Sequence, residues 1–195
     1  MKSRPAHLNP FRVSKLEGLQ YRFPPGKNWK LLENRFEELH RRGAIIGPHG
    51  SGKTTLVEEW VLRRRKRGKR ILKLRLSTEE RNIPDSFILA ARKDPDAEIF
   101  LDGAEQLGFS TWRHFLTRIG KYRALVITSH KAGRLPRLLK TETTVDMARD
   151  IVNELLEGTD SEGISEQLPF LLKRFHGNLR ELLFHLYDQA AGKNL

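Results

Sequence analysis

The sequence predicts a three-layer α/β fold with a mainly parallel sheet and a small C-terminal helical lid, and three observations support this prediction. A glycine-rich stretch at 47–54 separates an apolar run from an amphipathic segment. Short apolar runs recur before residue 146 with helix-like segments between them, which is typical of strands buried in a parallel sheet. Beyond residue 146 only helical periodicity remains.

Three segments follow from these patterns. Residues 1–27 hold four of the nine prolines, so we expect an extended lead-in there. Residues 28–145 carry the strands and helices of the α/β domain, and residues 146–195 form the helical lid. With 195 residues, 38% of them hydrophobic, the chain is long enough to bury a core.

Each element has its own local signal. Apolar residues spaced by three and four predict a helix that begins at Asn28 and has a basic last turn running to Gly43. We expect Ser110 to cap a later helix, and Asn178 with Glu181 has the spacing of a capping box before the last helix. The other expected elements are strands at 44–46, 71–76, 99–102, 124–129 and 143–145, a turn or short helix at 135–139, and helices at 52–67, 85–93, 111–121, 147–157 and 165–176.

The glycine-rich stretch Gly47-Pro48-His49-Gly50-Ser51-Gly52-Lys53-Thr54 has the Gly-x4-Gly-Lys-Ser/Thr spacing of a phosphate-binding P-loop. Its glycines let backbone N–H groups converge on a β-phosphate. Lys53 can reach the β- and γ-phosphates, and Thr54 can hold Mg²⁺. Residues 28–145 are therefore predicted to be a P-loop nucleotide-binding domain that binds ATP through Gly47, Pro48, His49, Gly50, Ser51, Gly52, Lys53, Thr54 and Thr55.

A second motif ends the apolar run Ile99-Phe100-Leu101-Asp102. This is the Walker B pattern, in which a carboxylate at the end of a strand beside the P-loop strand holds a water bound to Mg²⁺. Thr54 and Asp102 are thus the predicted metal ligands. The other interpretation is an ordinary aspartate at the end of a strand that caps a helix.

The charge of the chain is unbalanced and the imbalance is local. The net charge is +12, from 36 Lys and Arg against 24 Asp and Glu, and seven of the cations lie at 63–70. Such a run favours nucleic acid or an acidic protein surface as a partner, and nucleic acid would be bound through its phosphates without base selection. The alternative is a solvated face of the P-loop helix.

Some classes of protein are excluded or disfavoured. The chain has no cysteine, so disulfides and thiolate metal sites are excluded. No apolar run approaches the roughly 18 residues that a membrane-spanning helix needs, and no apolar segment of a signal peptide follows Met1. We therefore expect a cytoplasmic protein, and no pattern in the sequence indicates its oligomeric state.

Together these motifs resemble the AAA+ and related ATPases of the additional-strand class, over about residues 28–188. The details are most similar to the signal-transduction ATPases that include the NACHT group, whose motifs read Asp-Gly-x-Asp-Glu and Thr-Ser-Arg. This chain has Asp102-Gly103-Ala104-Glu105-Gln106 and Thr128-Ser129-His130. Gly177-Asn178-Leu179-Arg180-Glu181 resembles the sensor-2 stretch of AAA+ proteins, and the resemblance implies that Arg180 touches the γ-phosphate.

The chain also departs from these families. AAA+ ATPases generally place a glutamate directly after the Walker B aspartate to activate water, and here Gly103 stands at that position. Glu105 could serve as the base if the following turn folds back, Glu79 or Glu80 could serve from the end of a neighbouring strand, or no efficient base is present. His130 replaces an arginine, which weakens a γ-phosphate contact because an imidazole is mostly uncharged at neutral pH.

We therefore predict an Mg-ATP-binding protein that hydrolyses ATP slowly and acts as a nucleotide-dependent switch or accessory ATPase, with Lys53, Glu105 and Arg180 as catalytic residues. One alternative is a P-loop kinase of a small molecule, for which Arg134 and Arg137 are candidate lid arginines. The other is a DNA- or protein-binding module that holds ATP without hydrolysing it.

Overall fold

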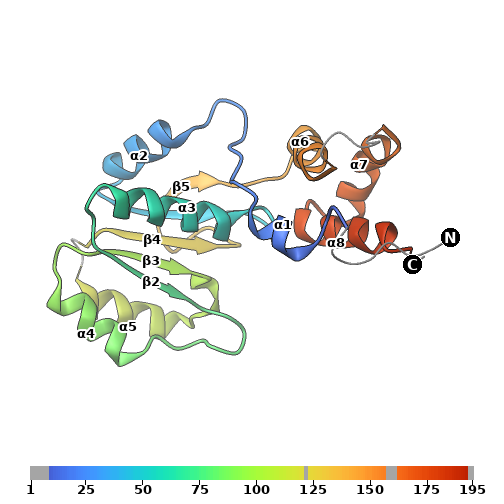
Figure 1. Ribbon diagram of the computed structural model, residues 1–195. Coiled ribbons are helices and arrows are strands. Elements are labelled where there is room, and N and C mark those ends of the chain that lie inside the picture. The colour runs from blue at the N-terminus through green and yellow to red at the C-terminus, as the bar shows by residue number, and fades with distance from the viewer. Residues whose placement is uncertain (1–8, 121–122, 157–161, 193–195) are drawn as a thin grey trace. The chain divides into compact units, whose positions relative to one another are not determined.

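The computed structural model describes residues 9–120, 123–156 and 162–192, and the chain forms two compact units (Figure 1). The sheet unit comprises residues 25–47 and 53–141. The helical unit comprises the described parts of 1–24 and 142–195 together with residues 48–52. Among the described residues, no helix has both the length and the apolar character needed to cross a membrane.

The sheet unit is built on five strands in the order β2-β3-β4-β1-β5, and every neighbouring pair is parallel. This result confirms the predicted α/β class. One expectation was wrong, because the strand that ends in Asp102 does not lie beside the P-loop strand; β4 stands between them. The strands are β1 (Arg42–Ile46), β2 (Ile71–Arg75), β3 (Glu98–Asp102), β4 (Leu125–Ser129) and β5 (Arg137–Lys140).

Helices cover both faces of this sheet (Figure 1). Helices α4 (Asp85–Lys93) and α5 (Phe109–Ile119) lie on one face, and α2 (Trp29–Glu38) and α3 (Lys53–Lys66) lie on the other. A single 3₁₀ turn, η2 (Ala104–Gln106), follows β3. The unit therefore has the three layers that the sequence predicts.

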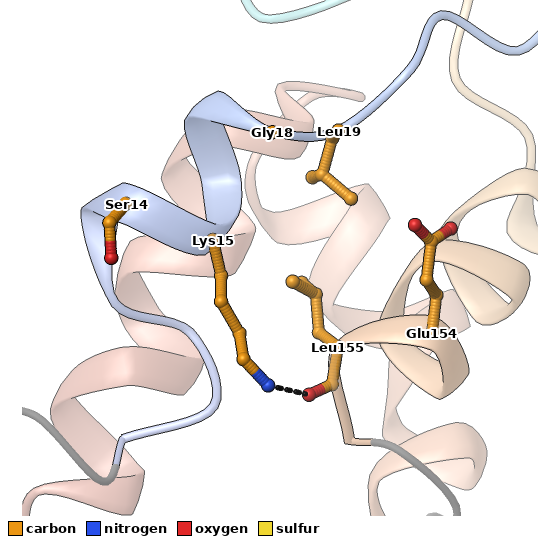
Figure 2. A pocket seen from close by; sticks show the side chains of 6 residues that line it. All are labelled: Ser14, Lys15, Gly18, Leu19, Glu154 and Leu155. Carbon is orange, nitrogen blue, oxygen red and sulfur yellow. Dashed lines mark hydrogen bonds between the residues drawn. The ribbon is translucent and has the colours of Figure 1, made fainter.

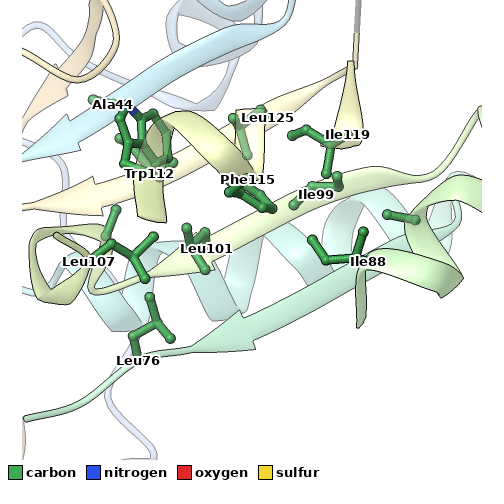
Figure 3. Close-up of a cluster of buried hydrophobic side chains, with 13 residues drawn as sticks. Ala44, Leu76, Ile88, Ile99, Leu101, Leu107, Trp112, Phe115, Ile119 and Leu125 are labelled. Carbon is green, nitrogen blue, oxygen red and sulfur yellow. The ribbon is translucent and has the colours of Figure 1, made fainter. Parts of the chain in front are cut away.

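Successive side chains of strand β3 point to opposite faces of the sheet and pack in the apolar layers on both sides. Ile99 and Leu101 of β3 pack in the cluster beneath α4 and α5, with Trp112 and Phe115 (Figure 3). Phe100 points the other way, and its ring stands edge-on to Trp60 of α3 at 5.4 Å between centroids. Apolar side chains therefore lie on both faces of β3, and its two charged residues, Glu98 and Asp102, stand at its two ends.

The amino end of β3 carries a buried ion cluster. Glu98 is fully buried, and its Oε2 accepts a 2.8 Å hydrogen bond from Nε of Arg64. The guanidinium groups of Arg64 and Arg41 both donate to Oε1. Hydrogen bonding to Glu98 is the main cause that raises the pKa of Arg64. The carboxylate is thus fully paired, as a buried charge requires.

The helical unit has its own core, and the N-terminal segment is part of it. Phe11 is buried among the apolar side chains of the C-terminal helices, and Asn9 Nδ2 donates to Tyr187 O at 2.9 Å. Arg22 pairs with Glu154 and with Asp150. The helices of this unit are α1 (Val13–Glu17), α6 (Val145–Leu156), α7 (Glu162–Arg174) and α8 (Leu179–Ala190).

Several local expectations were wrong. The lead-in is not wholly extended, because α1 forms within it. The first predicted helix ends at Glu38, since His40 and Arg41 adopt left-handed φ angles of 51° and 59° and turn the chain into β1. Helix α5 begins at Phe109 after Gly108, so Ser110 lies inside the helix.

The fifth strand also differs from its prediction. It is β5, formed by residues 137–140, whereas the expected strand at 143–145 is replaced by the start of α6. Leu138 and Leu139 are buried between two exposed cations, a pattern too short to separate a strand from a turn. The first eight residues of the lead-in, and the expected helix ends at 121 and 157, lie outside the described residues.

Candidate functional site

The P-loop lysine lies in the sheet unit at the carboxyl end of β1. Gly47 N donates to Ser129 O at 3.2 Å, which ties the start of the loop to β4. Lys53 is the first residue of α3, and its Nζ donates to Gly47 O at 2.7 Å. Burial lowers the pKa of Lys53, although Glu105 and Asp102 act in the opposite direction. A buried ammonium group is therefore held at this edge of the sheet.

Asp102 faces the first turn of α3, as the two predicted metal ligands require. Thr54 Oγ1 donates to its Oδ2 at 3.0 Å. Thr128 Oγ1 donates to its Oδ1 at 2.5 Å and accepts from Gly103 N at 2.8 Å. Arg75 Nε is 3.8 Å from Oδ2. The link made by Thr128 was not predicted, although the polar end of its strand was noticed.

Gly103 stands where the sequence resemblance to AAA+ ATPases would place a glutamate, and its geometry excludes one. Its φ angle is 83°, a conformation that favours glycine. A Cβ at this position would stand 2.6 Å from Leu76 O, closer than any side chain tolerates. A glutamate at position 103 is therefore incompatible with this turn, and a carboxylate beyond Asp102 must come from elsewhere in the chain.

Glu105 supplies such a carboxylate, because η2 turns the chain back toward β4. Its Oε1 accepts a 2.8 Å contact from His130 Nε2. The other oxygen, Oε2, is buried and has no hydrogen-bond partner among the described residues. The condition set from the sequence, that the turn fold back, is thus met in the structure.

His130 connects this carboxylate to the P-loop lysine. Its Nδ1 lies 3.3 Å from Lys53 Nζ and 3.2 Å from Gly47 O. With Nε2 protonated toward Glu105, a neutral ring can accept from the lysine through Nδ1. The sequence indicated only that His130 replaces an arginine. The ring's contacts to Lys53 and Glu105 could not be seen there.

The middle of the P-loop, residues 48–52, belongs to the helical unit. Ser51 Oγ donates to Pro48 O at 2.8 Å. Gly50 has φ 66°, and a Cβ there would stand 1.7 Å from Asn178 Oδ1. A Cβ on Gly52 would stand 3.2 Å from the ring of Tyr21. His49, a predicted ATP-binding residue, is exposed, and Thr55 is partly buried in the first turn of α3.

Asn178 caps α8 as predicted, but the reciprocal bond from Glu181 goes to the Asn178 side-chain amide, because the backbone N of Asn178 donates to Phe175 O at 2.8 Å. Asn178 Oδ1 accepts from Glu181 N at 3.3 Å, and Asn178 Nδ2 donates to Glu181 Oε1 at 2.7 Å. Arg180 follows the cap, and its backbone N would lie 3.2 Å from a Cβ on Gly50. Its side chain is exposed and makes no ion pair with any residue that the structure describes.

The other candidates lie apart from the Lys53–His130–Glu105 group. Glu79 and Glu80 are exposed beyond β2, two strands away from β4 in the sheet order. Ser77 Oγ accepts from their backbone N–H groups, and Glu80 O accepts from Ser77 N. Arg134 donates to Leu107 O and lies over Trp112 at 5.1 Å. Arg137 is exposed on β5.

The basic run at 63–70 is largely engaged within the sheet unit. Arg63 lies over Trp29 at 4.4 Å, Arg64 binds Glu98, Arg67 binds Glu33 at 2.6 Å, and Arg70 binds Asp94 at 2.8 Å. The remaining cations, Arg65, Lys66 and Lys69, are exposed and form no ion pair among the described residues. They are the part of the run that is available to a partner.

A separate pocket lies in the helical unit (Figure 2). It has a volume of about 250 Å³. Lys15 Nζ reaches Leu155 O at 3.4 Å across it, and Glu154 on its wall is already paired with Arg22. Its lining residues are Ser14, Lys15, Gly18, Leu19, Glu154 and Leu155. These polar groups are few and already engaged, so we assign this pocket no chemistry.

Comparison with known proteins supports the fold. No protein-family model matches the chain, and no curated protein matches it in sequence. Among solved structures it is similar to one described as a DNA replication initiation factor, with a TM-score of 0.55 and 16% sequence identity. The match covers 78% of this chain and 56% of that protein, so this chain spans little more than half of its length. At this identity the likeness establishes the P-loop α/β fold.

Proposed function

We propose that the protein binds Mg-ATP at the P-loop, hydrolyses it slowly, and uses the bound nucleotide as a switch or in an accessory ATPase role. The observation that carries this proposal is the approach of Thr54 Oγ1 to Asp102 Oδ2 at 3.0 Å beside the buried ammonium of Lys53. A hydroxyl, a carboxylate and a lysine in this arrangement are the protein groups that hold Mg²⁺ and the phosphates in P-loop NTPases.

The residues present fit Mg²⁺ bound together with a nucleotide. The ion prefers oxygen ligands and keeps several waters, so one carboxylate and one hydroxyl are sufficient when phosphate oxygens complete the shell. Among the described residues no cluster of three or more His, Cys, Asp or Glu could hold a metal. Thr54 and Asp102 would therefore bind the ion only with the phosphates present, and Mg²⁺ would neutralise charge that develops on them.

Slow turnover is supported by the surroundings of the candidate base. Position 103 cannot carry a glutamate, so a general base has to come from Glu105, two residues further along the chain than AAA+ ATPases generally place it. Arg180 remains a proposed γ-phosphate contact that rests on the resemblance of residues 177–181. The closer likeness to the NACHT group is likewise a proposal that rests on sequence resemblance.

We further propose an acidic partner, with nucleic acid as the first candidate. The solved structure that this chain resembles is named for DNA replication initiation, and Arg65, Lys66 and Lys69 form an exposed set of cations. Such contacts would be made to phosphates and would weaken as salt rises. The kinase alternative loses support, because Arg134 is held by Leu107 O and Trp112.

The test is nucleotide binding and product analysis with matched lysine variants. Lys53→Ala is expected to weaken Mg-ATP binding by about tenfold to a hundredfold in calorimetric titration, because a charge-assisted contact to phosphate is lost. Lys69→Ala, an exposed lysine on the same unit, should bind normally. Equal affinity in the two variants would refute a nucleotide site at Lys53.

The products then separate the alternatives. ADP and free phosphate without an acceptor support a hydrolase, and ADP formed only with an added acceptor supports a kinase. Unchanged ATP with tight binding supports a binding module. Running each assay with and without DNA, over a series of salt concentrations, tests the nucleic-acid partner at the same time.

A further inference from the structure

One turn of the sheet unit is held rigidly enough to aim a single carboxylate oxygen. The turn follows β3, and its residues Ala104 and Leu107 are buried on either side of Glu105. Gly103 fits against Leu76 O with no room for a side chain, and Leu107 O accepts from Arg134. The backbone that carries Glu105 is therefore fixed at both of its ends.

The two oxygens of Glu105 have different surroundings. Oε1 is 2.8 Å from His130 Nε2, whereas Oε2 is buried and has no hydrogen-bond partner among the described residues. A buried carboxylate oxygen without a donor is costly, and such atoms are rare in folded proteins. Oε2 is accordingly the oxygen that can accept a hydrogen bond from a bound water.

The difference between the two oxygens arises from His130, which follows β4, the strand next to β3, and contacts only Oε1. It follows the last residue of β4, and its Nδ1 lies within 3.3 Å of Lys53 Nζ. When Nδ1 accepts from the ammonium group, the proton of a neutral ring must be on Nε2, where it faces Glu105. Gly47 O also lies 3.2 Å from Nδ1, but it already accepts from Lys53 Nζ at 2.7 Å. The lysine can therefore donate to both atoms, which favours the tautomer that holds the carboxylate.

We propose that His130 is a positioning residue that fixes Glu105 through Oε1, so that Oε2 is presented as the proton acceptor for water. This inference rests on the proposed ATP hydrolysis. In that reaction the water oxygen forms a bond to the γ-phosphorus and the bond from that phosphorus to the bridging oxygen breaks. The water proton passes to Glu105 Oε2, and ADP and phosphate leave.

Two substitutions of His130 separate its two contacts. The amide nitrogen of glutamine can replace Nε2, and the amide of asparagine can replace Nδ1. His130→Gln should therefore retain the donor to Glu105 and keep kcat within about threefold of the natural protein. His130→Asn should lose that donor and lower kcat about tenfold or more, since a misplaced base forfeits general-base catalysis. Both variants should bind Mg-ATP within about threefold of the natural protein.

A double variant tests whether His130 acts through Glu105. Glu105→Gln should lower kcat to the level of His130→Asn or below, and the two substitutions together should lower it no further than Glu105→Gln alone. Equal kcat in His130→Gln and His130→Asn would overturn the inference. So would full turnover in Glu105→Gln, or an unaltered protein that binds Mg-ATP without any hydrolysis.

A spectroscopic readout does not depend on turnover. Nitrogen NMR of the full-length protein labelled at histidine should show the Nε2–H tautomer for His130, assigned by its loss in His130→Gln. The Nδ1–H tautomer would leave no proton facing Glu105 and would overturn the inference. Failure here leaves Mg-ATP binding intact, whereas failure of the nucleotide site itself shows as unchanged binding in Lys53→Ala.

Discussion

The two ends of strand β3 carry buried carboxylates that are treated in opposite ways. At the amino end, Glu98 accepts hydrogen bonds on both oxygens from two guanidinium groups. At the carboxyl end, Asp102 receives two hydroxyl groups, and nearby Glu105 keeps one buried oxygen without a partner among the described residues. Glu98 and Asp102 are four residue steps apart along the strand, a distance of about 13 Å.

The difference suggests that Glu98 stabilises the fold, whereas Asp102 and Glu105 are placed to bind a ligand. A buried carboxylate with both oxygens engaged by cations is poorly placed to bind a further ligand. Asp102, held by neutral hydroxyl groups with Arg75 no closer than 3.8 Å, can still exchange a hydroxyl contact for a metal ion. The amino end should therefore govern stability, and the carboxyl end should govern ligand binding.

Removing the amino-end charge should produce the largest loss of stability. Glu98→Gln leaves two arginines facing a neutral amide, one of them buried, and is expected to lower the free energy of unfolding by about 3–5 kcal/mol. Denaturant unfolding measures this loss. Mg-ATP affinity of the folded fraction should stay unchanged.

Glu33→Gln is the matched control, since Glu33 of α2 pairs with the exposed Arg67 just after the end of α3. Its cost should be below about 1 kcal/mol. If Glu98→Gln were as mild as this control, or if it weakened nucleotide binding in the folded protein, the division of roles between the two ends of the strand would be wrong.

The turn after Asp102 should be the next most sensitive feature. Gly103→Ala combines a strained φ angle with a 2.6 Å approach to Leu76 O, and we expect a loss of about 3 kcal/mol. Gly68→Ala has a similar φ of 75° but nothing within 4 Å of its Cβ, so strain alone should cost about 1 kcal/mol. Thermal unfolding of the pair isolates the contact, and equal losses would show that Gly103 is not sterically required.

The smallest effect expected at this end belongs to the hydroxyl that links Asp102 to Gly103. Thr128→Val removes a donor to Asp102 Oδ1 and an acceptor for Gly103 N, and should cost about 2 kcal/mol. Thr117→Val, which loses only an exposed bond to Arg113 O, should be close to neutral. A Thr128→Val protein with unaltered stability and unaltered Mg²⁺ dependence of ATP binding would remove Thr128 from the site.

The parts of the fold that depend on local pattern could be predicted from the sequence. The P-loop spacing and the apolar run before Asp102 are encoded in a few adjacent residues, and Asn178 with Glu181 is a local cap. The bounds of α4 matched the predicted 85–93 for the same reason. In each of these cases the physical cause lies within one turn or one strand.

Long-range pairings could not be predicted in this way. The insertion of β4 between β1 and β3 is a matter of topology, which no single segment encodes. In the sequence Phe11 is an isolated aromatic residue in a proline-containing stretch, so its burial among the C-terminal helices could not be predicted. His130 meets Lys53 across 77 positions of sequence, so its part in the site needed the fold.

The stacking of Arg134 on Trp112 gives the site a built-in optical reporter. Trp112 is almost fully buried beneath the guanidinium of Arg134. Burial lowers the pKa of Arg134, and the charge of Glu105 opposes that shift, so the guanidinium responds to Glu105. Indole emission responds to a nearby cation. A ligand that disturbs Glu105 should thus shift tryptophan fluorescence without any added dye, and Trp112→Phe should abolish that signal.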